Sequence, residues 1–585
     1  MRLAALDWVV LASYFILSFG LAWWLRGRAQ RSLADFFVSG RHVPWWLAGT
    51  SMVATTFAAD TPLVVTGLTA QFGIAGNWLW WSLLLSGMLT VFFFARLWRR
   101  AGVLTDVELI ELRYAGRPAA FLRGFRALYL GVLMNCLIMG WVNLAMVKIL
   151  KVSLNLEKIE AVLVCLAITA VYTTLSGLWG VLITDLFQFV LMMTMAIVLA
   201  YFGVEAVGGL GALRTKVLAL EAANPGGGSL LAFLPEPGSA WMPLTVFLVY
   251  VGVNWWASWY PGAEPGGGGY VAQRIFSAKD EKHSLWATLW FNIAHYALRP
   301  WPWILVALAS VVLYPGLADK EAGYVQVMVD HLPASLRGLM LASFLAAYMS
   351  TISTHLNWGA SYAINDFYRR FLRPEASEQH HLRLSQVATL VLMGLAAGVT
   401  YFLETIRGAW QLLLMIGAGT GAVYLLRWYW WRINAWSEIS AMMAAFFTSL
   451  ALKLWPPFAG SEPVVFSKNM VVTTAVCSAV WLAVTYCTQP EPAAHLLNFY
   501  RRVRPAARGW RPIAAQAPDV PVVASGWYNL RAWILGCALV YLALFSTGKL
   551  LLGFWTSGLL LAAGSAAAGG LLYLQFARRG WQSFG

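Results

Sequence analysis

The sequence predicts an all-α membrane protein that crosses the bilayer about fifteen times. Its residues are 60% hydrophobic and only 11% charged, and the mean hydropathy is +0.65. Segments of about 18 or more mostly apolar residues recur along the whole chain, which is the pattern of membrane-spanning helices. A soluble domain does not need this much apolar surface, so the composition indicates a multi-pass transmembrane protein.

The positive charge is distributed as membrane topology requires. The net charge is +15, and most of the 41 Lys and Arg residues fall in segments that become cytoplasmic if the N-terminus lies outside and fifteen spans follow. This predicts a protein of the plasma (inner) membrane with a cytoplasmic C-terminus. Basic clusters such as Arg96, Arg99 and Arg100 then anchor the chain to the lipid bilayer, and no nucleic-acid partner is expected.

The predicted spans follow one another with short links. The first, residues 8–25, has no small-residue cleavage site after it and is expected to be retained. The next five cover residues 45–72, 78–97, 122–147, 159–175 and a segment from about residue 178. A Gly- and Pro-rich outer loop follows at residues 208–240. The next five spans after this loop cover residues 242–260, 285–313, 341–370, 387–403 and 410–431, and four more spans follow them.

The second span carries an acid at mid-membrane. In the stretch FAADTP, Asp60 lies just before Thr61 and Pro62. Proline removes a backbone donor and frees a carbonyl upstream, so this helix is expected to be broken at Thr61-Pro62. A broken, charged span is typical of an ion or solute site, whereas the alternative is a kinked helix whose acid is paired with a neighbour.

Asp185 is a second acid within a span. It lies in the sixth span, within the first two turns from the cytoplasmic side. It is either a functional carboxylate or a side chain that reaches the membrane interface.

The seventh span ends in aromatic residues and a run of glycines. The glycines do not form a phosphate loop, because no GK[ST] follows and no strand precedes them. Aromatic faces stack on sugars or cap cations, although packing and interfacial roles are equally open. The candidate solute-binding residues here are Asn254, Trp255, Trp256, Trp259 and Tyr260.

Two basic side chains lie deep in the eighth span. His295 and Arg299 precede Pro300. An arginine at this depth requires an acid in the protein or an anionic group on a solute. We therefore count both residues among the candidates for solute binding.

The ninth span carries a polar stripe on an apolar helix. Ser350, Ser353, Thr354, Asn357 and Ser361 share one face at helical spacing. One interpretation is hydrogen bonding between helices, which serine and threonine provide in many membrane proteins. The other is a site for a hard cation, because such ions prefer hydroxyl, carboxylate and carbonyl oxygens.

Several stretches resemble the sodium:solute symporter family. They are FAADTP, TDVELIELRYAG, TDLFQF, QRIFSAKDEKHS, and above all AAYMSTIS followed by AINDFYRRF. The resemblance implies a five-plus-five inverted-repeat (LeuT-type) core with accessory helices. The expected regions are an N-terminal accessory helix (1–43), the first five-helix repeat (44–207), an outer loop (208–240), the second repeat (241–432) and C-terminal accessory helices (433–585). Each repeat would begin with an interrupted helix, at Thr61-Pro62 and at Tyr260-Pro261.

The resemblance also implies two sodium (Na+) sites. The first would use the backbone carbonyls of Ala58, Thr61 and Ala347 and the hydroxyls of Ser350 and Thr351. The second would use Asp185, Ser350, Ser353 and Thr354. Asp60 would supply a nearby negative charge that helps to retain the cation.

The expected function is a sodium-coupled symporter that imports a small polar organic solute by alternating access. About seven extra residues follow Asn254, and the fourth span lacks the arginine that holds a carboxylate in sialic-acid transporters, so the solute stays open. A proton-coupled symporter and a solute sensor that needs a separate signalling partner are the alternatives. No nucleophile with a base is evident, so an enzyme is not expected. A homodimer is possible.

Overall fold

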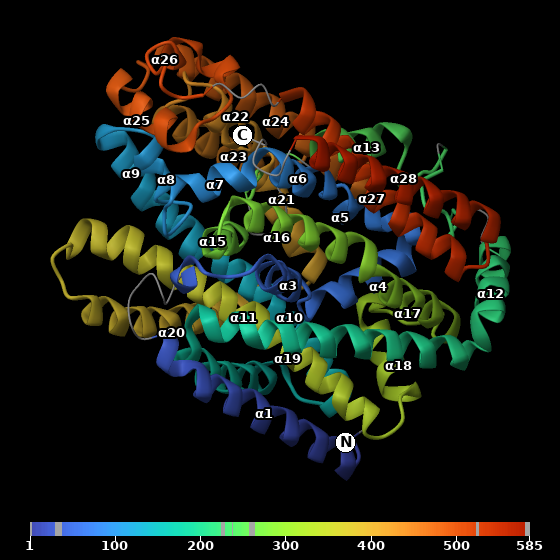
Figure 1. Ribbon diagram of the computed structural model, residues 1–585. Coiled ribbons are helices and arrows are strands. Elements are labelled where there is room, and N and C mark those ends of the chain that lie inside the picture. Colours follow the sequence, from blue (N-terminus) through green and yellow to red (C-terminus); the bar gives the residue numbers. More distant parts are fainter. Residues whose placement is uncertain are drawn as a thin grey trace.

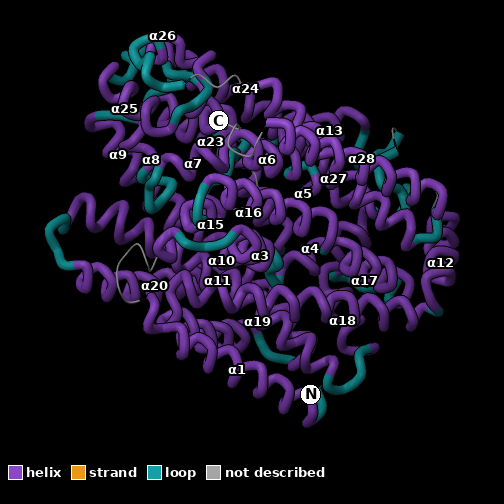
Figure 2. The backbone as a smooth tube through the Cα atoms, in the orientation of Figure 1, coloured by secondary structure: helices purple, strands orange, loops and turns teal. Residues whose placement is uncertain are grey.

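The chain folds into a bundle of helices in the computed structural model (Figures 1 and 2). The structure describes residues 3–29, 38–223, 228–236, 238–254, 256, 264–521 and 526–579. Within these residues there are helices and loops but no strand, and the sole extended pairing is a bridge between Val43 and Ala278. The all-α prediction is therefore confirmed.

The helices of the first part of the chain include those of residues 44–207, where the first repeat is predicted. They are α1 (Ala5–Ala29), η1 (Ser39–Arg41), α3 (Trp45–Thr56), α4 (Asp60–Phe72), η2 (Ile74–Asn77), α5 (Trp78–Trp81), α6 (Leu84–Leu89), η3 (Thr90–Phe94), α7 (Ala95–Ala101), α8 (Leu109–Arg113), α9 (Gly116–Leu128), η4 (Tyr129–Met134), α10 (Asn135–Leu154), α11 (Lys158–Val207) and α12 (Gly209–Ala223).

The next group carries the second predicted repeat. It contains α13 (Leu244–Val249), η5 (Tyr250–Asn254), α15 (Gly269–Ser277), α16 (Glu281–Ile293), η6 (Ala294–Leu298), α17 (Pro300–Leu313), η7 (Lys320–Ala322), α18 (Gly323–His331), α19 (Leu336–Ser361), η8 (Tyr362–Leu372), α20 (Glu378–Phe402), α21 (Ile406–Gly417) and α22 (Gly421–Tyr429).

The last group packs outside these two. It contains α23 (Ala435–Leu454), α24 (Glu462–Cys487), α25 (Ala493–Val503), η9 (Ala507–Trp510), α26 (Arg511–Ala514), α27 (Gly526–Leu551) and α28 (Trp555–Arg579). The α27–α28 pair forms a hairpin at the edge of the molecule (Figure 1).

Fewer helices meet the length and hydropathy of a full membrane span than the fifteen predicted. Ten described helices do so, or eleven if α21 and α22, which meet at an angle of 46°, form one bent span. The difference arises partly from breaks, because a full crossing takes about 20 helical residues. The second predicted span is divided into α3 and α4, which have 12 and 13 residues. Each half is too short to cross by itself.

The break in the second span lies upstream of its expected position. Helix α3 ends at Thr56 and α4 begins at Asp60, so the break covers residues 57–59 and Pro62 lies within the first turn of α4. The first turn of a helix tolerates proline because its N–H groups have no partner within the helix. Proline here therefore follows the break instead of forming it.

Helix α11 combines the predicted fifth and sixth spans. It is 50 residues long, which would be about 75 Å if it were straight, more than twice the thickness of a hydrocarbon core. The predicted boundary between the two spans falls within residues 171–181, whose side chains lie outside the description.

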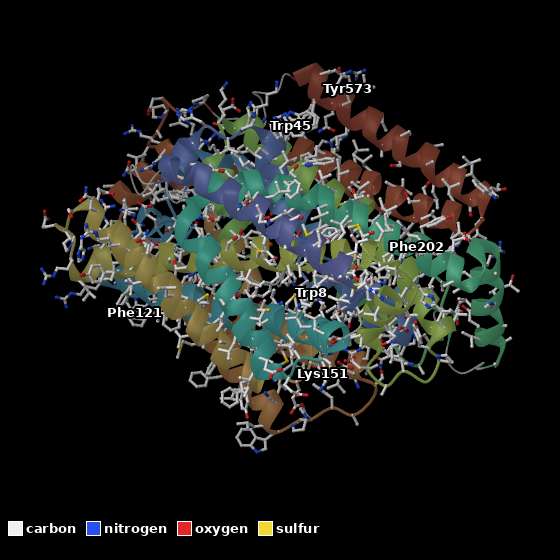
Figure 3. All side chains as sticks on the ribbon, turned by 90° about the horizontal axis from the view of Figure 1, so that it is seen from below. Trp8, Trp45, Phe121, Lys151, Phe202 and Tyr573 are labelled. Atoms are coloured by element: carbon white, nitrogen blue, oxygen red, sulfur yellow. The ribbon has the colours of Figure 1, made fainter. Side chains whose placement is uncertain are left out.

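Helix α19 is the centre of the bundle. It packs on α11, α1, α10 and α20, and almost all of its side chains are buried. Large apolar side chains such as Trp8, Phe121 and Tyr573 lie instead on the outside of the bundle, where lipid would cover them (Figure 3).

Glycine permits the close contact between α19 and α10. A Cβ atom at Gly359 would lie 2.7 Å from the carbonyl oxygen of Gly131 and would collide with the Asn135 amide. We expect Gly359→Ala to destabilise the protein by about 1–3 kcal/mol through overpacking. Gly394→Ala on α20 is the control, because nothing lies within 4 Å of its added Cβ. Thermal unfolding in detergent measures both, and equal stability of the two variants would contradict this packing.

Candidate functional site

The break between α3 and α4 lies inside the protein and faces α19. Every residue from Thr55 to Thr61 is buried. The hydroxyl of Thr351 on α19 donates a hydrogen bond of 2.9 Å to the carbonyl of Thr55. This bond joins the interrupted helix, α3 and α4, to the striped helix α19.

Most carbonyls at the break accept one hydrogen bond from the chain, and a carbonyl oxygen has two lone pairs, so each can take a further interaction. The N–H of Phe57 bonds to Val53 and Ala54, and the N–H of Thr61 bonds to Ala58 at 3.3 Å. The last carbonyls of a helix lack intrahelical partners and carry partial negative charge. The C-terminal end of α3 is therefore an array of oxygens suited to a small hard cation.

The residues of the predicted first sodium site fall into two groups. Ala347, Ser350 and Thr351 are buried on the face of α19 that meets α3. Ala58 lies in the break, and Thr61 lies in the first turn of α4, from which its hydroxyl donates to the Thr56 carbonyl at 3.2 Å. The carbonyl that meets α19 belongs to Thr55, which the sequence analysis did not name because the position of the break could not be predicted within one turn.

The predicted second site is assembled around Asp185. The hydroxyl of Ser350 donates to Oδ1 of Asp185 at 2.5 Å, and the hydroxyl of Ser51 on α3 donates to Oδ2. Thr354 lies beside them, 3.3 Å from the Thr55 hydroxyl. Ser353 differs, since its hydroxyl bonds to the Ser350 carbonyl of its own helix at 3.1 Å.

An arginine that the sequence analysis overlooked occupies the same place. Arg274 on α15 is fully buried, donates to Thr354 at 2.8 Å, and lies 3.9 Å from Asp185. It belongs to the QRIF stretch, and its preceding neighbour Gln273 donates to Asn357 of the stripe at 2.8 Å. Members of the stripe thus meet partners from α3, α11 and α15.

His295 and Arg299 lie on another side of the break. Nδ1 of His295 is 2.9 Å from the Thr56 hydroxyl, and Arg299 donates to the same hydroxyl at 3.1 Å. The guanidinium of Arg299 also lies over the rings of Phe57 and Trp303. The structure therefore brings both predicted residues to the break.

Asp60 is the first residue of α4 and is fully buried. Its Oδ2 accepts a hydrogen bond of 3.1 Å from the indole of Trp410 on α21, while Oδ1 makes no hydrogen bond to the described residues. Backbone N–H groups of the α4 N-terminus and the charge of Arg299 both act on this carboxylate. Trp410 had no distinguishing sequence signal.

The predicted residues of the seventh span are only partly described. The amide of Asn254 donates to the Leu79 carbonyl at 3.0 Å and to the Ser82 hydroxyl at 2.9 Å. Trp256 is half-buried. Trp255, Trp259 and Tyr260 lie outside the described residues, as does the break expected at Tyr260-Pro261.

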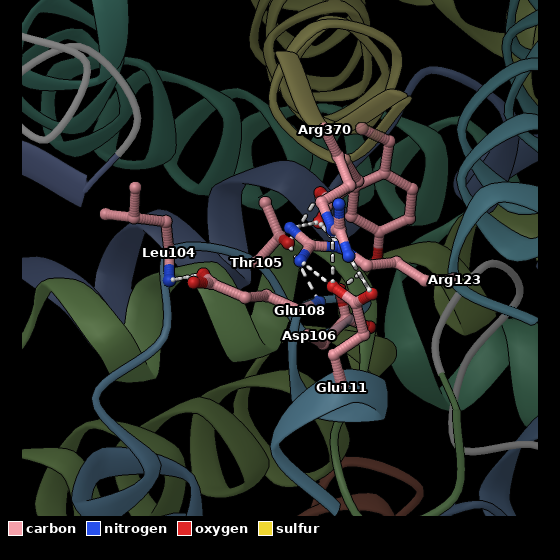
Figure 4. Close-up of polar contacts among 9 residues, drawn as sticks. Leu104, Thr105, Asp106, Glu108, Glu111, Arg123 and Arg370 are labelled. Carbon is pink, nitrogen blue, oxygen red and sulfur yellow. Dashed lines mark hydrogen bonds and ion pairs between the residues drawn. The ribbon is translucent and has the colours of Figure 1, made fainter. Parts of the chain in front are cut away.

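Ion pairs join the helices at the arginine-rich end of the bundle. Arg123 bonds to Asp366 at 2.7 Å and to Glu111 at 2.6 Å, and Arg370 also binds Glu111 (Figure 4). Deeper in the protein, the buried carboxylate of Glu264 lies between two further arginines, Arg126 and Arg427. The glycine-rich stretch therefore contributes a buried carboxylate to this end.

A profile of the sodium:solute symporter family matches residues 36–445. This chain belongs to the sodium:solute symporter family. The symporter is 24% identical over 479 residues to a sodium/glucose cotransporter of Vibrio parahaemolyticus, covering 78% of this chain and 86% of the relative. It is 25% identical over 474 residues to a human sodium/myo-inositol cotransporter, covering 75% and 68%.

The fold of the symporter matches a solved transporter. The structure of a Na+-coupled sialic acid symporter in a substrate-bound, outward-open state superposes with a TM-score of 0.67 at 17% identity, covering 84% of this chain and 99% of that one. The likeness establishes a shared transporter fold. The chain is therefore a multi-pass membrane transport protein whose family couples solute movement to sodium.

The Glu111 cluster predicts a pH dependence of stability. Burial opposes ionisation, but Arg370 and Arg123 hold the pKa of Glu111 below its ordinary value of 4.5. A lowered pKa stabilises the folded state above pH 4.5, and this contribution is lost as the pH falls through the folded-state value. We expect Glu111→Gln to cost about 1 kcal/mol at pH 7 and progressively less below pH 4.5.

The measurement is thermal unfolding of the wild type and Glu111→Gln between pH 7 and pH 3.5. Glu375→Gln, at an exposed position, is the control and should match the wild type throughout. A stability difference for Glu111→Gln that stays constant with pH would refute the ionic role.

Proposed function

We infer that this protein is a sodium-coupled symporter that imports a small polar organic solute by alternating access. The observation that carries the proposal is the bond between Thr351 of α19 and the Thr55 carbonyl at the end of α3. A sodium ion at this junction would be held by Ala347, Ser350 and Thr351 and by carbonyls near the break, including Thr55 and the predicted Ala58.

Sodium at this position would favour one conformation of the transporter. The ion would bind both repeats at once, so its binding free energy would stabilise the form in which α3 and α19 are in contact. Coupling requires that sodium and solute bind one state better than the other. Loss of sodium to the cytoplasm would then release the two helices and open the inner side.

A second sodium would enter at Asp185, Ser350 and Thr354, with Ser353 turning from its own backbone. One charge that crosses 100 mV supplies about 2.3 kcal/mol, and two supply about 4.6 kcal/mol. This corresponds to roughly three decades of accumulation of a neutral solute. Two ions would therefore allow strong uptake.

The solute is proposed to lie beside the break, among Asp60, Trp410, His295 and Arg299. Asp60 Oδ1 is a buried acceptor without a partner in the described chain, next to an indole ring. This arrangement is suited to a solute with hydrogen-bond donors, such as a sugar, a polyol or an amino acid. The glucose and myo-inositol named for the relatives are of this kind.

The proposed orientation places the N-terminus outside and the C-terminus in the cytoplasm of a cell membrane. The arginine-rich end of the bundle, with Arg123 and Arg370, would then face the cytoplasm, in accordance with the positive-inside rule.

The first test is sodium-specific stabilisation of the purified protein. Sodium chloride should raise the unfolding temperature in a saturable way at constant ionic strength, whereas potassium and choline chloride should not. Thr351→Val should raise the half-maximal sodium concentration about tenfold or more, because it removes a hydroxyl at the junction without changing side-chain volume.

Thr400→Val is the matched control, because this buried hydroxyl of α20 binds Asn143 and Gly140, away from the junction. It should leave the sodium response unchanged. No sodium-specific shift in the wild type would reject sodium coupling and favour proton coupling or a sensor. If the wild type does respond to sodium, liposomes with an inward sodium gradient, tested with glucose, myo-inositol, sialic acid and proline, would show which solute accumulates.

Asp60 should strengthen sodium binding through its charge. A unit charge about 10 Å from a cation is worth about 1.7 kcal/mol at an effective dielectric constant near 20. Asp60→Asn should therefore raise the half-maximal sodium concentration by up to about 15-fold in the same titration. Asp330→Asn, at an exposed position on α18, should not. An unchanged midpoint for Asp60→Asn would exclude a role for this charge.

A further inference from the structure

The guanidinium of Arg274 lies among the oxygens of the proposed second sodium site. One Nη donates to Thr354 at 2.8 Å, and Nε donates to Ser51 at 3.2 Å. The same Nη lies 3.9 Å from Oδ2 of Asp185. Arginine has no acceptor atoms, so the two hydrogen bonds direct N–H groups at hydroxyl oxygens, and the positive charge lies within ion-pair distance of the carboxylate that a cation would need.

Arg274 balances the charge of this site. Asp185 carries one negative charge and Arg274 one positive charge, and neither side chain is exposed. The side chains that hydrogen-bond to the pair are neutral, namely Ser51, Gln273, Ser350 and Thr354. A sodium ion added to this arrangement would leave a net positive charge buried at membrane depth, which is costly. Sodium and Arg274 therefore compete for one carboxylate.

One contact of Arg274 lies outside the set of cation ligands. The remaining Nη donates to Oε1 of Gln273 at 2.9 Å, on the same helix α15. Gln273 is itself anchored to Asn357 of α19 at 2.8 Å. This acceptor can keep the guanidinium bound on the α15 side after its contacts with Asp185 and Thr354 are lost.

We propose that Arg274 is a tethered counter-ion of Asp185 that sodium must displace to bind the second site. The inference rests on the proposed sodium-coupled function. In the sodium-free form, Arg274 links α15 to α3, α11 and α19. In the sodium-bound form the ion takes its place on Asp185 and Thr354, and α15 is released from that link. Arg274 thereby sets the affinity of the site.

The competition has a measurable size. The apparent affinity of a ligand falls with the fraction of protein that can accept it, and here only the form with Arg274 withdrawn accepts sodium. Arg274→Gln removes the competing charge. We expect the half-maximal sodium concentration for thermal stabilisation to fall about tenfold or more. The double variant with Asp185→Asn should lose this gain, because the gain arises at Asp185.

A second measurement distinguishes displacement of Arg274 by sodium from simple charge repulsion between the two cations. In potassium chloride, Arg274→Gln should be less stable than the wild type, because Asp185 loses its partner. In saturating sodium chloride the two should unfold at the same temperature, because sodium has already replaced the arginine. Arg113→Gln is the control: this guanidinium is also fully buried but binds the carbonyls of Arg427, Trp430 and Trp431, so its loss should cost the same stability in both salts.

The outcomes distinguish the displacement of Arg274 from sodium coupling itself. A sodium response in the wild type with an unchanged midpoint in Arg274→Gln, or an equal loss of stability in both salts, would overturn the displacement and leave sodium coupling intact. No sodium response in either protein would reject the proposed function itself. Should Arg274→Gln fail to fold, Arg274→Lys keeps the charge without the planar fork, and its midpoint should fall below that of the wild type. An unchanged midpoint in that variant would also overturn the proposal.

Discussion

Backbone polar groups cannot be left unpaired inside a bilayer, and the break between α3 and α4 places such groups at that depth. The chain meets this constraint with the hydroxyls of α19. Thr351 bonds to the Thr55 carbonyl across the break. Thr351 can supply this hydroxyl because α19 is buried within the bundle, whereas a helix exposed to lipid could not reach the break.

Charges inside the described part of the bundle obey the same constraint, and several are paired with a group from another element. Asp185 of α11 is placed against Arg274 of α15. Arg126 contacts both Glu264 and Glu438, and Arg427 binds Glu264 at 2.9 Å. Removing one partner of such a desolvated pair strongly lowers the stability of the fold, because it leaves the other charge buried and unpaired. These contacts therefore fix how the helices meet. Glu264 gives the glycine-rich stretch a structural role that its composition did not suggest.

The sequence was informative where chemistry and periodicity coincide. Hydroxyls at helical spacing indicated that α19 lies inside the protein, and a mid-span acid next to proline indicated the interrupted helix. Three residues of the candidate site could not be predicted from the sequence, namely Thr55, Arg274 and Trp410. Their role depends on which elements meet in space, and nothing in their local sequence distinguishes them. The number of spans was less predictable for a related reason: hydropathy records how apolar a segment is, not where its helix stops. The fold class and the acid at Asp185 required only local signals.

The pairing of buried charges bears on how voltage acts on the transport cycle. With Asp185 balanced by Arg274 and Asp60 near Arg299, the charges of these four buried side chains sum to zero. Two bound sodium ions would make the same region doubly positive. An inside-negative membrane potential would then favour the step in which the sodium-loaded protein turns from outward-facing to inward-facing. It would have little effect on the return step of the empty protein. Transport current would therefore rise with an inside-negative potential and level off once the voltage-independent return became the slowest step.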